Sequence, residues 1–171
     1  MFPNTPASEA IFLDTETTRA VEEPGKPIEV IELAWAHLDF GVTSAQRYKP
    51  AGPVQWGALA THHILPGDLA DAPPSAQARA DVPPAAYWIG HNIDFDWKAL
   101  GSPPGVRRIC TLALARSLWP EVDSHSLSAL VYFTQGANKA TRDRLRSAHS
   151  ALADIEFCRD IFRLQVELVK P

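Results

Sequence analysis

Four carboxylates and one histidine in three short segments are the side chains of this sequence best suited to chemistry. They are Asp14 and Glu16 in IFLDTETT, Asp96 in HNIDFD, and His149 and Asp154 in HSALAD. Carboxylate oxygens are the ligands that Mg²⁺ prefers, and two such ions can act from both sides on a phosphoryl displacement. Histidine titrates at about 6.5, which suits a general base at neutral pH. This set of residues therefore predicts metal-dependent phosphodiester hydrolysis.

Asp14 and Glu16 lie two residues apart in a segment that reads as a strand, so their side chains point to the same face of a sheet. The preceding residues 11–13 are apolar, which places the pair close to the core. Two carboxylates held together near a core resist joint ionisation. A bound divalent cation removes this difficulty, so the pair favours a metal site.

The second and third segments pose questions of geometry. Asp94 and Asp96 both lie near the start of an expected helix, and local physics does not choose between them as the functional acid. His149 and Asp154 are five residues apart, which on a helix turns the two side chains about 140° away from each other. The sequence therefore predicts that His149 lies in a loop or a distorted first turn.

The elements that must position these residues alternate between strands and helices. Strands are expected at 10–15, 28–38, about 44–49, 86–90 and 107–110. Helices are expected at about 55–65, 75–80, 94–100, 115–119, 126–133 and 149–169, the last with Leu152, Ile155, Phe162, Val166 and Val169 on one apolar face. The pattern predicts an α/β fold with a mixed sheet of about five strands flanked by helices. Residues 1–171 are expected to form a single domain with a flexible N-terminus at 1–8.

Composition sets broad limits on the function. The 171 residues are long enough to bury a core, and the net charge of −4 lacks the basic excess of many nucleic-acid binders, although four of the acids are proposed metal ligands. Cys110 and Cys158 form no C-x-x-C pair, which is typical of buried thiols in a reducing compartment. The sequence shows no secretory signal and no apolar run of about 18 residues. A cytoplasmic protein without a membrane partner is therefore expected.

Taken together, D-x-E, H-N-x-x-F-D and H-x-A-x-x-D resemble the three motifs of the DEDDh (DnaQ-like) 3′→5′ exonucleases, from about residue 10 to 165. The resemblance implies a ribonuclease H-like fold and selects Asp96, which follows Phe95, over Asp94. It implies that Asp14, Glu16, Asp96 and Asp154 bind two Mg²⁺ ions, for which Mn²⁺ can substitute, and that His149 is the general base. The expected activity is hydrolysis of DNA from a free 3′ end to 5′-mononucleotides, in repair or proofreading-type processing.

Several further residues are candidates for substrate contact. ALATHHIL is similar to a family segment near the 3′-terminal nucleotide, which suggests His62, and the others lie beside the three motifs. They are Thr15, Thr17, His91, Asn92, Arg142 and Arg144. The chain departs from the family after D-T-E-T, where Thr18 and Arg19 begin a loop that is of a Gly-Leu type in relatives.

Three other functions remain open on the sequence alone. An exoribonuclease on the same scaffold would need the same acids, because RNA differs from DNA at the 2′-OH. A non-catalytic module with this fold would not need all five catalytic positions. A metal-dependent phosphatase would need the acids, but it would make no use of the H-N-x-x-F-D segment.

Overall fold

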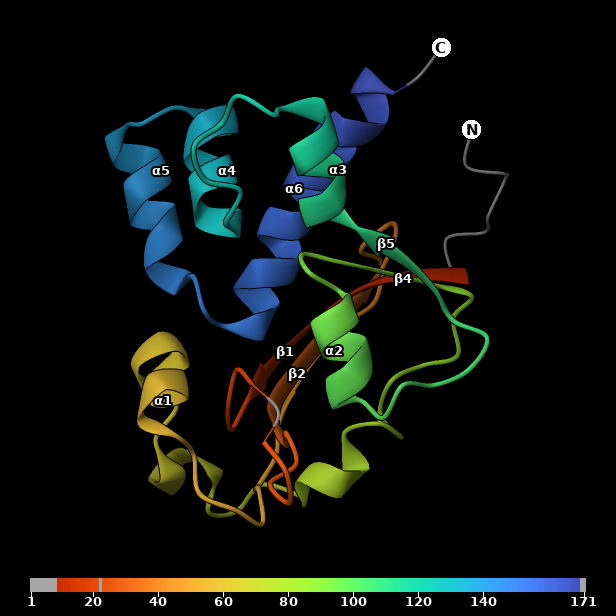
Figure 1. Ribbon diagram of the computed structural model, residues 1–171, viewed down its shortest axis with the longest axis vertical. Helices are drawn as coiled ribbons and strands as arrows, with labels where there is room; N and C mark the ends of the chain where they lie inside the picture. The colour runs from red at the N-terminus through yellow and green to blue at the C-terminus, as the bar shows by residue number, and fades with distance from the viewer. Residues whose placement is uncertain (1–8, 22, 170–171) are drawn as a thin grey trace.

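A five-stranded mixed sheet forms the centre of the computed structural model, which describes residues 9–21 and 23–169 (Figure 1). The strands are β1 (Ala10–Thr17), β2 (Val30–His37), β3 (Thr43–Arg47), β4 (Tyr87–Gly90) and β5 (Arg107–Cys110). Their order is β3-β2-β1-β4-β5, in which β2 is antiparallel to both β3 and β1, whereas β4 is parallel to β1 and β5 is parallel to β4. The predicted mixed sheet is confirmed. The expected flexible segment 1–8 lies outside the described residues.

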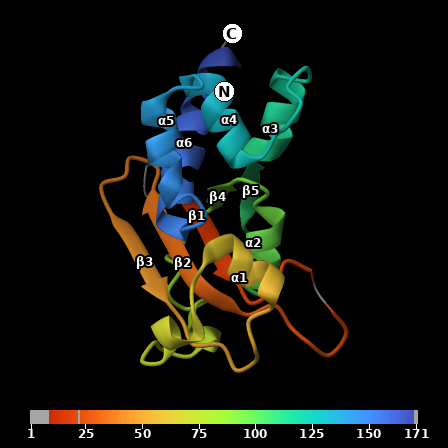
Figure 2. The ribbon, with the colours of Figure 1, turned by 90° about the vertical axis from the view of Figure 1, so that its left-hand side faces the viewer.

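Helices gather mainly at one end of the molecule. They are α1 (Trp56–His62), α2 (Asp94–Ala99), α3 (Thr111–Leu118), α4 (Leu127–Gln135), α5 (Lys139–Arg144) and α6 (Ala151–Leu168), with 3₁₀ turns at Pro66–Leu69, Ser75–Gln77 and Leu145–Ser147. In both ribbon views α3, α4, α5 and α6 form one group, and α1 lies apart from it (Figures 1 and 2). Within the described ranges, no helix has the length and apolar character that crossing a membrane requires.

The alternation of side chains along β1 divides the core into two layers. Phe12 packs on one face, in a cluster with Ala34 of β2 and Phe162 of α6. Ile11 and Leu13 pack on the other face, in a second cluster that contains residues such as Leu100. Because side chains of a strand alternate between faces, Asp14 and Glu16 share the α6 face with Phe12.

The sheet-facing stripe of α6 consists of residues three or four apart. Ala151, Ile155, Cys158 and Phe162 are buried against β1 and β2 in this way. Leu152, expected on the apolar face, is 38% exposed, and that expectation is wrong. The reason is geometric, because one residue further along a helix turns the side chain by about 100° away from the stripe. Val169, also expected on that face, follows the end of the helix and is exposed.

Candidate active site

Three carboxylates from two elements meet at one point. Asp14 and Glu16 extend from β1, and Asp154 extends from the first turn of α6, which packs across this strand. Each offers an oxygen atom, and the three atoms lie within 4.8 Å of one another. A set of close, hard oxygen donors fits the chemistry of Mg²⁺. These residues therefore can hold a divalent cation.

Asp96 joins this group through Thr15 on β1. Its carboxylate is buried, and Oδ1 accepts hydrogen bonds from the Thr15 backbone N–H (2.9 Å) and the Thr15 hydroxyl (2.7 Å). Asp94 is exposed and forms an ion pair with Arg108 of β5 instead. The structure thus brings Asp96 to the other carboxylates, and it places Asp94 on the surface.

The end of β4 brings α2 close to β1. A Cβ atom on Gly90 would lie 2.9 Å from the Leu13 carbonyl oxygen and 2.7 Å from Cδ1 of Ile93, so only glycine fits without a shift. Asn92 then takes a positive φ of 67° and turns the chain into α2. This close approach allows Thr15 to reach Asp96.

Burial and mutual repulsion make these acids difficult to ionise. Burial, followed by the charge of Asp96, raises the pKa of Asp14 well above its usual range. Burial, followed by the charge of Asp154, raises the pKa of Glu16 to about 8. Burial raises the pKa of Asp96 to about 7 against the opposing hydrogen bonds from Thr15, and that of Asp154 to about 6 against the opposing charge of His149. A divalent cation would reverse this balance by favouring the charged forms.

His149 lies outside the helix, as its spacing from Asp154 predicts. It has a positive φ of 67° and precedes α6, which begins at Ala151. Its backbone N–H donates to Oδ1 of Asp154 at 3.3 Å, and its side chain is exposed. The histidine therefore lies directly beside the acidic group and remains open to solvent.

Thr15 and Thr17, two of the predicted substrate contacts near the end of β1, form hydrogen bonds within the protein. Thr15 uses both its N–H and its hydroxyl to hold Asp96. Thr17 is also buried, and its hydroxyl donates to the Arg19 carbonyl oxygen at 2.8 Å. The polar groups of Thr15 therefore connect β1 to α2, and the hydroxyl of Thr17 holds the chain that follows β1.

His62 ends α1 and turns a ring nitrogen inward. Nδ1 accepts the Ile64 backbone N–H at 2.9 Å, and the buried Nε2 has no hydrogen-bond partner among the described residues. Burial lowers the pKa of His62, and the nearby Thr17 backbone and Glu32 oppose that effect. His62 thus lies close to the acidic group, as a contact to the terminal nucleotide would require.

His91 and Arg144, also expected at the substrate, instead connect elements of the protein. The ring nitrogens of His91 pair with the Thr111 hydroxyl at 3.0 Å and the His125 carbonyl oxygen at 2.9 Å. Arg144 binds Asp160 of α6 at 2.7 Å and stacks on the ring of Phe157 at 4.9 Å. The polar groups of both side chains are therefore paired within the protein and are not free to bind a substrate.

Arg142 and Asn92 are the members of the predicted contact set that face solvent. The Arg142 side chain is 59% exposed, and its contact with Asp143 at 3.5 Å is a surface ion pair. Asn92 is exposed on the turn between β4 and α2. These two positions keep the accessibility that a contact with a nucleic acid needs.

Glu32 of β2 is the site residue that the sequence reading missed. It lies opposite Glu16 in the antiparallel pairing of β1 with β2, and it is buried. Its charge adds to the repulsion on Glu16 and Asp154. The signal was its position in VIELAWAH, where an acidic residue alternates into an otherwise apolar strand.

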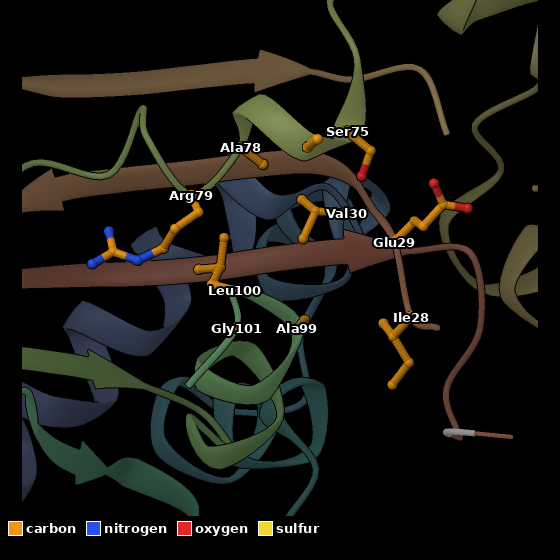
Figure 3. Close-up of a pocket in the computed structure, with 10 residues that line it drawn as sticks. Ile28, Glu29, Val30, Ser75, Ala78, Arg79, Ala99, Leu100 and Gly101 are labelled. Atoms are coloured by element: carbon orange, nitrogen blue, oxygen red, sulfur yellow. The ribbon is translucent and has the colours of Figure 1, made fainter. Parts of the chain in front are cut away.

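A separate pocket of about 410 Å³ lies on the other side of the sheet (Figure 3). Its lining includes Val30, Ala78 and Leu100, which belong to the core layer opposite α6. Arg79 extends along its wall in Figure 3, and the guanidinium lies 5.7 Å from the ring centre of Trp88. The carboxylates on the α6 face do not line this pocket.

Comparison with known proteins identifies relatives of the chain. Exodeoxyribonuclease 10 of Escherichia coli (strain K12) is 32% identical over 146 residues, which cover 84% of this chain. The chain spans 62% of the length of that curated relative. No protein-family model matches the sequence.

Solved structures share the fold. Exonuclease X in complex with 5′ overhanging duplex DNA superposes with a TM-score of 0.67 at 23% identity, covering 94% of each chain. The zinc-bound form of the complex of E. coli exonuclease I with single-stranded DNA has a TM-score of 0.73 at 19% identity, covering 94% of this chain and 40% of that one. The nuclease domain of 3′hExo, a DEDDh family member bound to rAMP, has a TM-score of 0.67 at 12% identity, with 94% and 92% covered.

The sheet topology and the ribonuclease H-like fold of these exonucleases agree with the architecture described above. The relative at 32% identity matches 84% of the chain, which itself carries the three acidic motifs. The chain is therefore similar in sequence to exodeoxyribonuclease 10 of Escherichia coli, and it shares the fold of DEDDh exonucleases.

Proposed function

We propose that the protein is a metal-dependent 3′→5′ exodeoxyribonuclease that releases 5′-mononucleotides from a free 3′ end. The observation that carries this proposal is the convergence of Asp14, Glu16 and Asp154 within 4.8 Å. Asp96, held by Thr15, supplies the fourth acid. Similarity to exodeoxyribonuclease 10 supports DNA as the substrate, and a role in DNA repair or proofreading-type processing is part of the proposal.

The four acids fit two magnesium ions by the chemistry of their oxygen atoms. Bound cations would neutralise the carboxylates, polarise the scissile phosphate and make an attacking water more acidic. Asp14, Glu16 and Asp154 would hold cations with their converging oxygen atoms, and Asp96 would add the fourth carboxylate from α2. Manganese would substitute, because it accepts the same oxygen donors.

His149 would accept the proton of the attacking water on a ring nitrogen. Its exposed side chain stands beside Asp154 and outside the helix, so it can swing towards a bound phosphodiester. General-base assistance of this kind contributes about 10²–10⁴ to the rate. His62, with its unpaired Nε2, would contact the terminal nucleotide, and the exposed Asn92 and Arg142 would meet the strand.

An exoribonuclease is the second candidate. The similar fold of the 3′hExo nuclease domain, which binds rAMP, supports it as an alternative. The acids would perform the same hydrolysis on either nucleic acid, because the reacting phosphodiester is the same. The choice depends on contacts with the 2′-OH.

A labelling experiment tests the proposal. Matched DNA and RNA strands carrying a 3′ or a 5′ label are incubated with Mg²⁺, Mn²⁺ or EDTA. Stepwise shortening of DNA from the 3′ end, abolished by EDTA, is expected. Initial internal cuts, or faster shortening of RNA than of DNA, would overturn the proposed direction or substrate. Asp14→Ala serves as the inactive control and should retain less than about a tenth of the activity.

The proposed active site draws on elements from both ends of the described chain. Residues 1–171 would act as one exonuclease domain, since the acidic group draws on β1, α2 and α6 and so needs nearly the whole described fold. The expected cytoplasmic location stays a prediction.

A further inference from the structure

Glu32 occupies an unusual place for a charged residue. It lies on β2 in register with Glu16 of β1, and only 8% of the residue is exposed. Like Ala34 two residues later, it faces α6. A buried carboxylate needs strong partners, because its desolvation is otherwise unfavourable.

Both oxygens of Glu32 have such partners within the protein. Oε2 accepts the backbone N–H of Ala151 at 2.9 Å, and Oε1 accepts from Nε of Arg47 at 3.1 Å. The side chain is therefore fixed by β3 on one side and by α6 on the other. Since both oxygens are occupied, Glu32 differs from Asp14 and Glu16, whose oxygens converge on the candidate metal position.

The Ala151 N–H is the first of the N-terminal helix donors that have no partner within α6. Ser150 occupies the cap position, yet its side chain makes no capping hydrogen bond. Glu32 supplies that acceptor from a strand 119 residues away in sequence. Its negative charge also interacts favourably with the positive end of the helix dipole.

This cap lies between the two functional residues of the third motif. Ala151 follows His149 by two residues and precedes Asp154 by three, and Oδ1 of Asp154 accepts the His149 N–H. A shift of the start of α6 would therefore move the histidine and the acid together. Misplacement by about 1 Å can lower a rate by 100-fold.

We propose that Glu32 is a positioning residue that caps α6 and so holds His149 and Asp154 opposite Asp14 and Glu16. Its effect on the rate rests on the proposed nuclease function, whereas the cap itself does not. Glu32 acts through Ala151 and touches neither the reacting phosphate nor a cation.

Three single variants separate this role from general damage. Glu32→Ala removes the acceptor and should lower kcat about 10- to 100-fold with little change in KM. Glu32→Gln retains one carbonyl oxygen for the Ala151 N–H and should recover most of the rate. Glu29→Ala is the matched control, because Glu29 accepts the backbone N–H groups of Ala51 and Gly52 and lines the pocket on the face of the sheet opposite α6. Its kcat should remain near that of the wild type.

A double-mutant cycle tests whether Glu32 acts through the histidine. In the His149→Ala background, Glu32→Ala should lower kcat by a smaller factor than it does in the wild-type background, because the histidine that it positions is already absent, so the two losses should not be fully additive. Fully additive losses, or wild-type kcat in Glu32→Ala, would overturn the proposal.

Amide hydrogen exchange at Ala151 provides a readout that does not need activity. Protection of this N–H should fall in Glu32→Ala and persist in Glu32→Gln and Glu29→Ala. Unchanged protection in Glu32→Ala would overturn the cap. If the wild-type protein cleaves neither DNA nor RNA, the nuclease proposal fails, but this exchange measurement still decides whether Glu32 caps the helix.

Discussion

Single residues at the acidic site differ in their immediate partners, although their chemistry is the same. Asp96 receives two hydrogen bonds from Thr15 and is shielded from solvent, whereas Asp94 two residues earlier is exposed and paired with Arg108. Because the two aspartates lie in the same first turn of one short helix, they form a natural matched pair. Their comparison tests the role of position without a change of residue type.

Asp96→Asn is predicted to lower kcat/KM by about 100-fold or more, since the charge needed to support a cation is lost while the shape is retained. Asp94→Asn should stay within about threefold of the wild type, because an exposed ion pair contributes little. Steady-state rates on 3′-ended DNA at saturating Mg²⁺ measure both variants. Equal losses in the two variants would contradict the assignment of Asp96.

His149→Ala is predicted to lower kcat by about 10²–10⁴ through loss of the general base. Metal binding should survive, because the three carboxylates whose oxygen atoms lie within 4.8 Å of one another remain in place. Calorimetric titration with Mn²⁺ alongside the kinetic assay separates the two effects. An unchanged kcat at saturating Mg²⁺ would remove His149 from the mechanism.

Residue types and motif order predicted the acids, but not the partners that hold them. The position of His149 outside the helix followed from helical geometry, and its φ of 67° agrees. Thr15 and Glu32 were missed as positioning residues because their partners, Asp96 and Ala151, are 81 and 119 residues away in sequence. Contacts at such separations depend on the packing of the sheet and α6, which local patterns do not encode.

At the scale of elements, α5 ties the basic segment to the helical group. Arg144 reaches Gln135 of α4 at 3.0 Å and Asp160 of α6 at 2.7 Å, whereas Arg142 points to solvent. The two arginines lie on the same short helix and were both expected at the substrate. Their surroundings now assign them different tasks.

Arg144→Ala is predicted to lower the free energy of unfolding by about 1–2 kcal/mol, from the loss of charged hydrogen bonds and of stacking on Phe157. Arg142→Ala should leave stability unchanged, weaken DNA binding and reduce the salt-dependence slope by about 1. Urea denaturation and binding titrations at several salt concentrations measure these effects. An exchanged pattern, with Arg142 needed for stability and Arg144 for binding, would refute the division.

The strands were predictable because apolar alternation and flanking Gly and Pro residues mark them clearly, as in AYWIG before His91. The basic segment 136–147 has no apolar periodicity, so its residues do not mark α5 as a helix. Leu152 has helical spacing to Ile155, which places it on the apolar face by pattern alone, whereas the buried stripe runs from Ile155 back to Ala151, the first residue of α6. The exact start of a helix depends on its cap, and here that cap comes from β2.

At the scale of the whole molecule, the acidic site links folding to pH. The carboxyls of an unfolded chain titrate at about 4, whereas those of Glu16, Asp96 and Asp154 have a pKa of about 8, 7 and 6 in the fold. Between these values the folded state holds protons that the unfolded state has released. Without metal, the contribution of these three groups to the free energy of unfolding therefore falls as the pH rises from about 4 to about 8.

Glu16→Gln is predicted to reveal this effect in EDTA. At pH 5 the variant and the wild type should unfold at similar temperatures, because Glu16 is protonated and uncharged in the fold. At pH 9 the variant should be more stable by roughly 5 °C, since the wild type must bury a repelled charge. The difference between the two proteins cancels the opposing titration of His62 and His91, whose pKa values burial lowers.

Magnesium should reverse this order, since it binds the ionised folded site and not the unfolded chain. The wild type should gain more from Mg²⁺ than Glu16→Gln, and more at pH 9 than at pH 5, because protons compete with the cation for the same oxygens. Thermal unfolding of both proteins at the two pH values, with EDTA or with Mg²⁺, measures how much the cation stabilises each protein at each pH. An equal gain from Mg²⁺ at both pH values would mean that the cation binds away from the raised carboxyls, and would separate metal binding from the group formed by Asp14, Glu16 and Asp154.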